Sequence, residues 1–164
     1  MSGGGGGRGS GGRSSAGLLL FRGRGEDVEV LLVHPGGPFW SKRDHGAWSI
    51  PKGECEEGED PRAAAWREFA EELGSPVPDG DAIDLGEVRQ KAGKVVRAWA
   101  IAGDLDARAV ASNTFTMEWP PRSGRTQEFP EIDRAQWFSL AEAHERINPA
   151  QAALLDRLRD AAAT

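Results

Sequence analysis

Four charged residues crowd into the stretch AAAWREFAEELG, residues 63–74. They are Arg67, Glu68, Glu71 and Glu72, all within six residues of a helix-forming run. Like charges three or four residues apart on a helix repel each other, by about 0.2–0.5 kcal/mol per pair. A divalent cation shared by the three carboxylates would offset that repulsion, because Mg²⁺ and Mn²⁺ prefer oxygen ligands. The alternative is an ordinary solvated helix flank, which is the commoner case for a helix taken alone.

The helix that carries these residues is predicted over residues 61–73. Asp60 is a favourable N-cap, Pro61 suits the first turn, and Gly74 suits the position after the last turn. The three glutamates fall across an arc of about 100°, beside the apolar face that docks on a sheet. That apolar face consists of Ala65, Trp66, Phe69, Ala70 and Leu73.

The residues before the helix extend the pattern. The segment GECEEGEDPRAAAWREFAEELGS, residues 53–75, resembles the Nudix box: Gly, five residues, Glu, seven residues, then Arg-Glu-aliphatic-x-Glu-Glu-x-Gly-aliphatic. Ser75 replaces the last aliphatic residue, and Phe69 fills the first apolar slot. Seven fixed letters match at the right spacings over 23 positions, which makes the signature highly specific. These are Gly53, Glu59, Arg67, Glu68, Glu71, Glu72 and Gly74.

The resemblance implies a role for each residue of the box. Glu68, Glu71 and Glu72 match the carboxylates that ligate Mg²⁺, with Mn²⁺ as a substitute, and Gly53 is grouped with them. Glu59 and Arg67 match a structural pair that holds the loop and the helix together. Glu68 is expected to serve as both ligand and base, and Glu71 is counted with it among the catalytic residues.

A base from a distal loop is the alternative, because some family members use one. Glu131 stands six residues before Trp137, a spacing seen in diadenosine-tetraphosphate-hydrolase-like members for an additional metal-linked glutamate. Glu131 is therefore included among the catalytic and metal-binding candidates, and Glu128 is the second option. Either one can equally be an ordinary loop acid.

Basic and aromatic residues near the box indicate the substrate. Lys52, just before the box Gly, resembles a phosphate-contacting Lys of the dinucleoside polyphosphate and diphosphoinositol branches, a role that suits a point-charge ammonium. Arg43 and Arg125 lie in two long polar loops, at positions suited to hold outer phosphates. Trp48 is the substrate-binding aromatic candidate, because an adenine needs a ring on which to stack. Further candidates in these roles are Lys42, Arg122, Trp40, Trp99 and Trp119.

The resemblance predicts Mg²⁺-dependent hydrolysis of a phosphoanhydride bond in a nucleoside diphosphate linked to another group. A dinucleoside polyphosphate is the preferred substrate, and a (deoxy)nucleoside triphosphate of the house-cleaning type is the alternative. The rival from another class is a non-catalytic nucleotide-sensing Nudix module. Such modules usually lack one or more box glutamates, and this chain has all of them, which favours the enzyme.

The remaining elements predict the fold around the box. The order of strands and helices predicts an α+β protein with a mixed, largely antiparallel sheet between helices, which suits the Nudix α/β/α sandwich. Residues 35–46 and 122–135 are expected to be long loops. Strands are expected at 16–22, 28–34, 47–53, 82–90, 94–103, 113–121 and 136–140, and the other helices at 140–147 and 149–162.

Composition limits the other classes of function. The chain has 164 residues and a net charge of −6, so we expect a Gly/Ser-rich flexible tail over 1–15 and one domain over 16–164. An acidic protein without a long apolar run or a signal peptide is expected in the cytoplasm. We expect a small-molecule nucleotide as its ligand, and neither a membrane nor a stable nucleic-acid partner. A homodimer is left open. Cys55 is the single cysteine, so no intrachain disulfide can form.

Overall fold

The computed structural model describes residues 14–162, apart from the side chain of Ala92. Residues 1–13 of the expected tail lie outside the described residues. Ser14 and Ser15 belong to β2 (Ser14–Arg22), the first strand of the described residues, which therefore begins two residues before its expected start. Every residue of β2 from Ser15 to Phe21 is buried, because the sheet is covered on both faces.

One sheet of six strands forms the centre of the molecule, in the order β5-β6-β2-β3-β9, with β4 paired to β2. Among the strands of residues 14–162 that form this sheet, only β2 and β6 run parallel. The other pairs are antiparallel, so the expected mixed, largely antiparallel sheet is confirmed. The strands are β3 (Glu29–Pro35), β4 (Lys52–Glu54), β5 (Ala82–Arg89), β6 (Val95–Ala102) and β9 (Ile132–Ser139).

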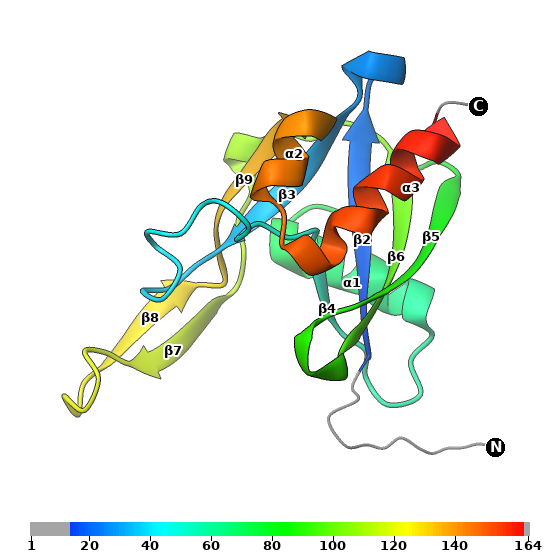
Figure 1. Cartoon of the computed structure of the whole chain (residues 1–164). Helices are drawn as coiled ribbons and strands as arrows, with labels where there is room; N and C mark the ends of the chain where they lie inside the picture. The colour runs from blue at the N-terminus through cyan, green and yellow to red at the C-terminus, as the bar shows by residue number, and fades with distance from the viewer. Residues whose placement is uncertain (1–13, 163–164) are drawn as a thin grey trace.

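Helices cover both faces of this sheet (Figure 1). The helix α1 (Pro61–Leu73) packs on one face, and α2 (Leu140–Arg146) and α3 (Ala152–Ala162) pack on the other. Successive side chains of β2 point to opposite faces, so Leu18 joins the α1 core and Leu19 joins the α2–α3 core. The expected α/β/α sandwich is confirmed.

One edge of β2 is shared by two strands. β3 pairs with the end of β2 at Phe21 and Arg22, whereas β4 pairs with its beginning at Ser15 to Gly17. The expected strand over 47–53 is therefore shorter and later than predicted, although Ser49 forms an isolated bridge with Val33. This arrangement places the start of the box directly on the central strand.

A second sheet of two strands lies apart from the first. It consists of β7 (Thr114–Glu118) and β8 (Thr126–Pro130), and with residues 119–125 between them it forms what we call the arm. Figure 1 shows the arm projecting from the body of the molecule. The expected loop over 122–135 is thus wrong, because β8 pairs with β7 and β9 already begins at Ile132.

The central helix has the predicted ends. The Asp60 carboxylate accepts a hydrogen bond from the Ala63 N–H at 3.1 Å, and Gly74 ends the helix at φ 71°. No helix among residues 14–162 is both long and apolar enough to cross a membrane.

Candidate active site

The box combines β4, the loop after it and α1. α1 buries Ala64, Ala65, Phe69 and Leu73 against the sheet, and its charged arc remains beside β4. Gly53 of β4 pairs with Ala16 of β2, and the Glu68 carboxylate lies against the α-carbon of Gly53. Only glycine permits this approach, because any side chain at position 53 would occupy the place of the carboxylate.

Arg67 holds the loop to the helix through Glu59, as expected for the structural pair. Its Nε donates to Glu59 Oε2 at 2.8 Å and its Nη2 donates to Glu59 Oε1 at 2.9 Å. The Glu56 N–H also donates to Glu59, at 2.9 Å. These bonds, those from Arg67 first, lower the pKa of Glu59 from 4.5 to about 2.

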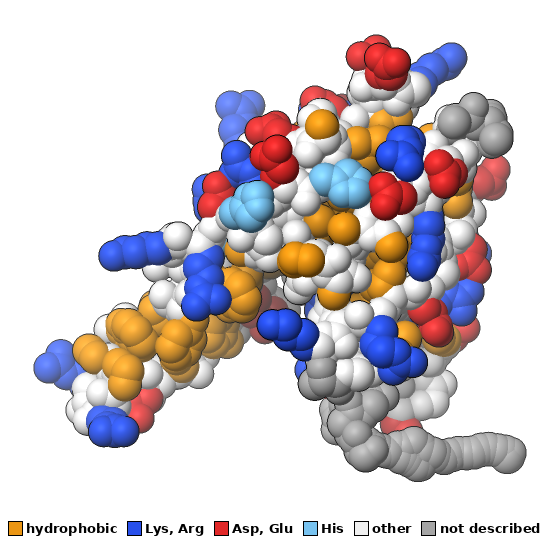
Figure 2. Space-filling model, in the orientation of Figure 1, with side chains coloured by type: hydrophobic (Ala, Val, Ile, Leu, Met, Phe, Trp, Pro, Cys, Tyr) orange, Lys and Arg blue, Asp and Glu red, His pale blue; other side chains and the backbone are white. Residues whose placement is uncertain are grey.

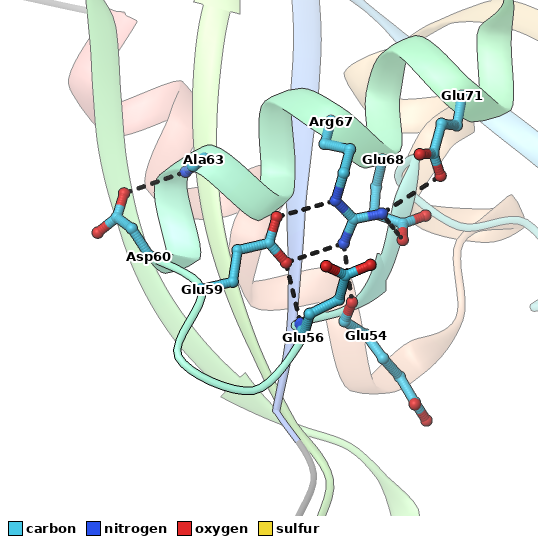
Figure 3. A network of polar contacts seen from close by, with 8 residues as sticks. All are labelled: Glu54, Glu56, Glu59, Asp60, Ala63, Arg67, Glu68 and Glu71. Atoms are coloured by element: carbon cyan, nitrogen blue, oxygen red, sulfur yellow. Dashed lines mark hydrogen bonds and ion pairs between the residues drawn. The ribbon is translucent and has the colours of Figure 1, made fainter.

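The same guanidinium reaches the catalytic candidates from its other side. Arg67 Nη1 donates to Glu68 Oε2 at 3.0 Å and to Glu71 Oε1 at 3.3 Å. Figure 3 shows Arg67 lying between Glu59 on one side and the two helix glutamates on the other. These contacts, those with Glu59 foremost, raise the pKa of Arg67. Arg67 therefore positions Glu68 as well as closing the loop.

Glu72 points inward rather than toward Arg67. Its Oε1 accepts a hydrogen bond from the Lys52 backbone N–H at 3.2 Å. Burial raises the pKa of Glu72 to about 8, and the negative charges of Glu68 and Glu131 act in the same direction. Burial likewise raises the pKa of Glu68, against the opposing effect of Arg67.

Glu68, Glu71 and Glu72 carry the kind of ligand atoms that a hard divalent cation binds. Within residues 14–162, no three His, Cys, Asp or Glu side chains converge as a preformed cage. Arg67 contacts Glu68 and Glu71, and the Lys52 N–H donates to Glu72. The glutamates nevertheless supply carboxylate oxygens, which Mg²⁺ prefers, and they carry like charges close together on one helix. A cation among Glu68, Glu71 and Glu72 would relieve that repulsion.

Glu131 is close enough to act on the box, whereas Glu128 is engaged elsewhere. The Glu131 charge contributes to the raised pKa of both Glu68 and Glu72. Its backbone is fixed, since its N–H donates to Asn113 and its carbonyl accepts from Gly36. The Glu128 carboxylate accepts from the Thr114 hydroxyl at 2.8 Å, on the arm.

The basic candidates occupy two different places. Lys52 is half-buried beside the box, where burial lowers the pKa of its ammonium while the Glu72, Glu54 and Glu68 charges oppose the shift. Arg43 and Arg125 are exposed, on the 35–46 loop and on the arm. The structure therefore groups only Lys52 with the box carboxylates.

Trp48 does not suit the role of a stacking platform, which corrects the prediction. Its side chain is 1% exposed, and its ring packs edge-on against Phe138 and His34 in the core. Its Nε1 donates to Asp44 at 2.7 Å. A base has no access to either face of this ring. Trp99 is also buried, at 7% exposed.

Sequence reasoning missed a buried polar contact that supports the 35–46 loop. His34 is 0% exposed; its Nε2 lies 2.5 Å from the Arg43 carbonyl and its Nδ1 lies 2.8 Å from Asp133 Oδ1. A carbonyl only accepts, so Nε2 donates to Arg43. The ring thus joins the loop to β3 and β9. The apolar run of β3 hinted that its last residues are buried, but no sequence signal identified these partners.

The chain resembles known proteins in sequence and in fold. A family model described as the NUDIX domain matches residues 11–158. A protein of Myxococcus xanthus named octanoyltransferase is 31% identical over 130 residues, 79% of this chain and 32% of that protein. An RNA pyrophosphohydrolase of Rhodospirillum rubrum is 38% identical over 77 residues, 45% of this chain and 42% of that protein. The matched region thus spans about a third of the length of the first relative and about two fifths of the length of the second.

Solved structures share the fold. An Ap4A hydrolase from C. elegans superposes with a TM-score of 0.59 at 22% identity, over 89% of this chain and 96% of that one.

Proposed function

The chain belongs to the Nudix family, and we propose that it hydrolyses a phosphoanhydride bond in a nucleoside diphosphate linked to another group, with a divalent cation. The main support for this proposal is the position of the Glu68 carboxylate. It lies on Gly53 at the central sheet, is held by Arg67, and shares an electrostatic environment with Glu72 and Glu131. Substrate phosphates are strongly negative, so such a cluster needs cation charge to bind them.

The residues of the chain divide the work. Glu68 accepts the proton of the attacking water, and Arg67 fixes its orientation through their 3.0 Å contact. Glu68, Glu71 and Glu72 would hold Mg²⁺, with Mn²⁺ as a substitute, together with Gly53 and Glu131. The bound cation would supply charge that stabilises the phosphates and would lower the pKa of water. Lys52 binds a phosphate oxygen as a point charge.

We propose a dinucleoside polyphosphate as the preferred substrate. Lys52 supports this choice, since it begins β4 and lies in the field of the box carboxylates. Exposed cations beyond the box, Arg43 and Arg125, suit a phosphate chain longer than that of a mononucleotide. A nucleoside triphosphate remains the alternative within the same chemistry. A non-catalytic sensing module is disfavoured, because every box glutamate is present.

A triphosphorylated RNA 5′ end is a second candidate substrate. The likeness to an RNA pyrophosphohydrolase, 38% identical over 77 residues, favours it. Its scissile bond is the same kind of phosphoanhydride, so the box residues keep their roles.

Product release tests the proposal. Diadenosine tetraphosphate, ATP, dGTP, ADP-ribose and triphosphorylated RNA are each incubated with Mg²⁺, with Mn²⁺ and with EDTA, and the products are resolved by anion exchange. We expect ATP plus AMP from the dinucleotide, lost in EDTA and lost in Glu68→Gln. Pyrophosphate from a nucleoside triphosphate, or pyrophosphate from RNA, would change the substrate and keep the mechanism. Turnover that persists in EDTA would refute the cation-dependent mechanism.

A further inference from the structure

The arm has two chemically different faces. Phe115 pairs with Phe129 and Met117 with Gln127, and the Trp119 N–H donates to the Arg125 carbonyl. Because side chains alternate along a strand and paired residues share a face, six of them lie on one side, which we call the aromatic face. It consists of Phe115, Met117, Trp119, Arg125, Gln127 and Phe129. The opposite face consists of Thr114, Thr116, Glu118, Thr126, Glu128 and Pro130.

The loop over 35–46 adds further rings to the aromatic face. Gly37 lies on Phe115, so close that an added Cβ would be 2.9 Å from its ring. Phe39 meets Trp119 edge-on, with ring centroids 5.8 Å apart. Nevertheless Phe39 is 63% exposed and Trp40 38%, and no other large hydrophobic side chain among residues 14–162 is as exposed. Contiguous apolar surface of this kind marks a binding site.

Cations surround this surface in an otherwise acidic protein. Lys42, Arg43, Arg122 and Arg125 are all exposed, and within the described chain none of them forms an ion pair. Arg43 lies over the Trp40 ring at 5.6 Å. Figure 2 shows hydrophobic side chains gathered along the arm, with basic side chains at its tip and beside its root. The local charge therefore complements a polyanion although the net charge is −6.

The root of the arm adjoins the box. Glu131 directly follows β8, and the next residue, Ile132, packs in the same apolar core as Phe69 of α1. The tip lies at the far end of the projecting arm (Figure 1). A ligand whose phosphates occupy the box can therefore continue along the arm.

We propose that the aromatic face, with Phe39 and Trp40, is a stacking platform for the unpaired bases of single-stranded RNA whose 5′ phosphates enter the box. The inference rests on the proposed hydrolase function and identifies the group beyond the scissile bond as an RNA strand. Interleaved aromatic rings and cations suit this ligand, since bases stack on the rings and the backbone binds the cations.

Among the candidate substrates, RNA is the one that would use the full length of the arm. The five paired residues of the arm extend over roughly 16 Å, with rings at the root and at the tip. A dinucleotide has a single base beyond its phosphates, whereas a strand presents successive bases to these rings. RNA held as a substrate is released after each turnover, so it is not the stable nucleic-acid partner that the net charge argued against.

Fluorescence anisotropy tests the platform without hydrolysis. The probe is a ten-nucleotide single-stranded RNA with a 5′ hydroxyl and a 3′ label, in EDTA and low salt, with full-length protein. We expect saturable binding that weakens with salt, with a log–log slope of about −3 for four phosphate contacts. The Phe39→Ala/Trp119→Ala double variant should bind about 10- to 100-fold more weakly. Thr116→Ala, on the opposite face, is the matched control and should bind as the wild type does.

A second measurement guards against misfolding of the arm. Phe39→Ala alone removes a largely exposed ring, so circular dichroism and thermal melting should match the wild type while RNA binding falls. With 5′-triphosphorylated RNA, the wild type should have a higher kcat/KM for a ten-nucleotide RNA than for a two-nucleotide RNA. The Phe39→Ala/Trp119→Ala variant should lose that difference.

Three results would overturn the proposal: no RNA binding by wild type, an equal loss in Thr116→Ala, or concentration-dependent self-association that Phe39→Ala abolishes while RNA binding stays unchanged. The last result would show that a second copy of the chain covers the arm. The binding assay is independent of hydrolysis, because the probe has no phosphoanhydride and the buffer has no divalent cation. If the protein bound this RNA but hydrolysed none of the substrates in the product-release experiment, only the proposed function would be refuted. Hydrolysis without RNA binding would refute the platform alone.

Discussion

The carboxylate of Glu68 occupies the space that a side chain at Gly53 would fill: an added Cβ would lie 2.1 Å from the Glu68 carboxyl carbon. Gly53 lies on β4 and Glu68 lies on α1, so this contact sets the distance between strand and helix at the box. Gly53 has no positive φ, and therefore close approach, rather than backbone conformation, requires a glycine here.

Gly53→Ala should separate activity from folding. The new methyl group displaces the Glu68 carboxylate, and a misplacement of about 1 Å in a catalytic group can cost on the order of 100-fold in rate. We expect kcat/KM to fall by that order while the circular dichroism spectrum is retained. Gly25→Ala is the control, because Gly25 has a positive φ but open space around it, away from the box. It should lose about 1 kcal/mol of stability and no activity. Full activity in Gly53→Ala would mean that catalysis does not require the Glu68 carboxylate to lie against position 53.

Glu68→Gln should abolish turnover and leave the fold intact. The amide keeps the size of the side chain and an oxygen for Arg67, but it cannot accept a proton and is a poorer cation ligand. A loss of about 10²–10⁴-fold in kcat is expected for a general base. Glu57→Gln, an exposed acid in the same box loop, is the matched control and should retain activity. Wild-type kcat in Glu68→Gln would contradict the assignment of the helix glutamates.

Glu131 and Glu128 should differ although both lie near the end of β8. The charge of Glu131 acts on Glu68 and Glu72, whereas the carboxylate of Glu128 is bound to the Thr114 hydroxyl. We expect Glu131→Gln to lower kcat at least about 10-fold, in line with the loss of an auxiliary base or ligand. Glu128→Gln should leave it near the wild-type value. Steady-state kinetics with saturating Mg²⁺ compares them, and the reverse order would make Glu128 the distal residue.

The Glu59–Arg67 pair should make stability depend on pH in acid. The pKa of Glu59 is about 2 in the fold and 4.5 without its partners, so the folded state favours the ionised form. The stabilisation is complete above about pH 4.5 and disappears as the pH falls toward 2. Urea unfolding of wild type and Glu59→Gln between pH 2 and 7 should show a gap that closes over this interval. Glu56→Gln, an exposed neighbour, is the control. A gap that stays constant with pH would contradict the pair's role.

Local signals made the box and its helix predictable. Asp60, Pro61 and Gly74 cap α1 at both ends, and the fixed letters of the box lie within 23 residues of sequence. Strand pairing and burial depend on partners far along the chain. β8 reads as a polar loop because TQEFP begins with three polar residues and ends in a proline, and only pairing with β7 makes it a strand. The burial of Trp48 was not predictable either, because its partners His34 and Phe138 lie far from it in the sequence.

The arm contributes to ligand selection without contributing to the packing of the two cores. Its strands pair with each other and with no strand of the six-stranded sheet, and neither apolar core contains a residue from it. Substitutions on the aromatic face therefore leave the packing of both cores unchanged, so they escape the loss of stability that restricts most mutations. Over evolutionary time, descendants of one ancestor can change the ligand they select by altering the arm, while the box and the sandwich stay the same. We expect ligand preference to diverge within such a lineage before the chemistry does.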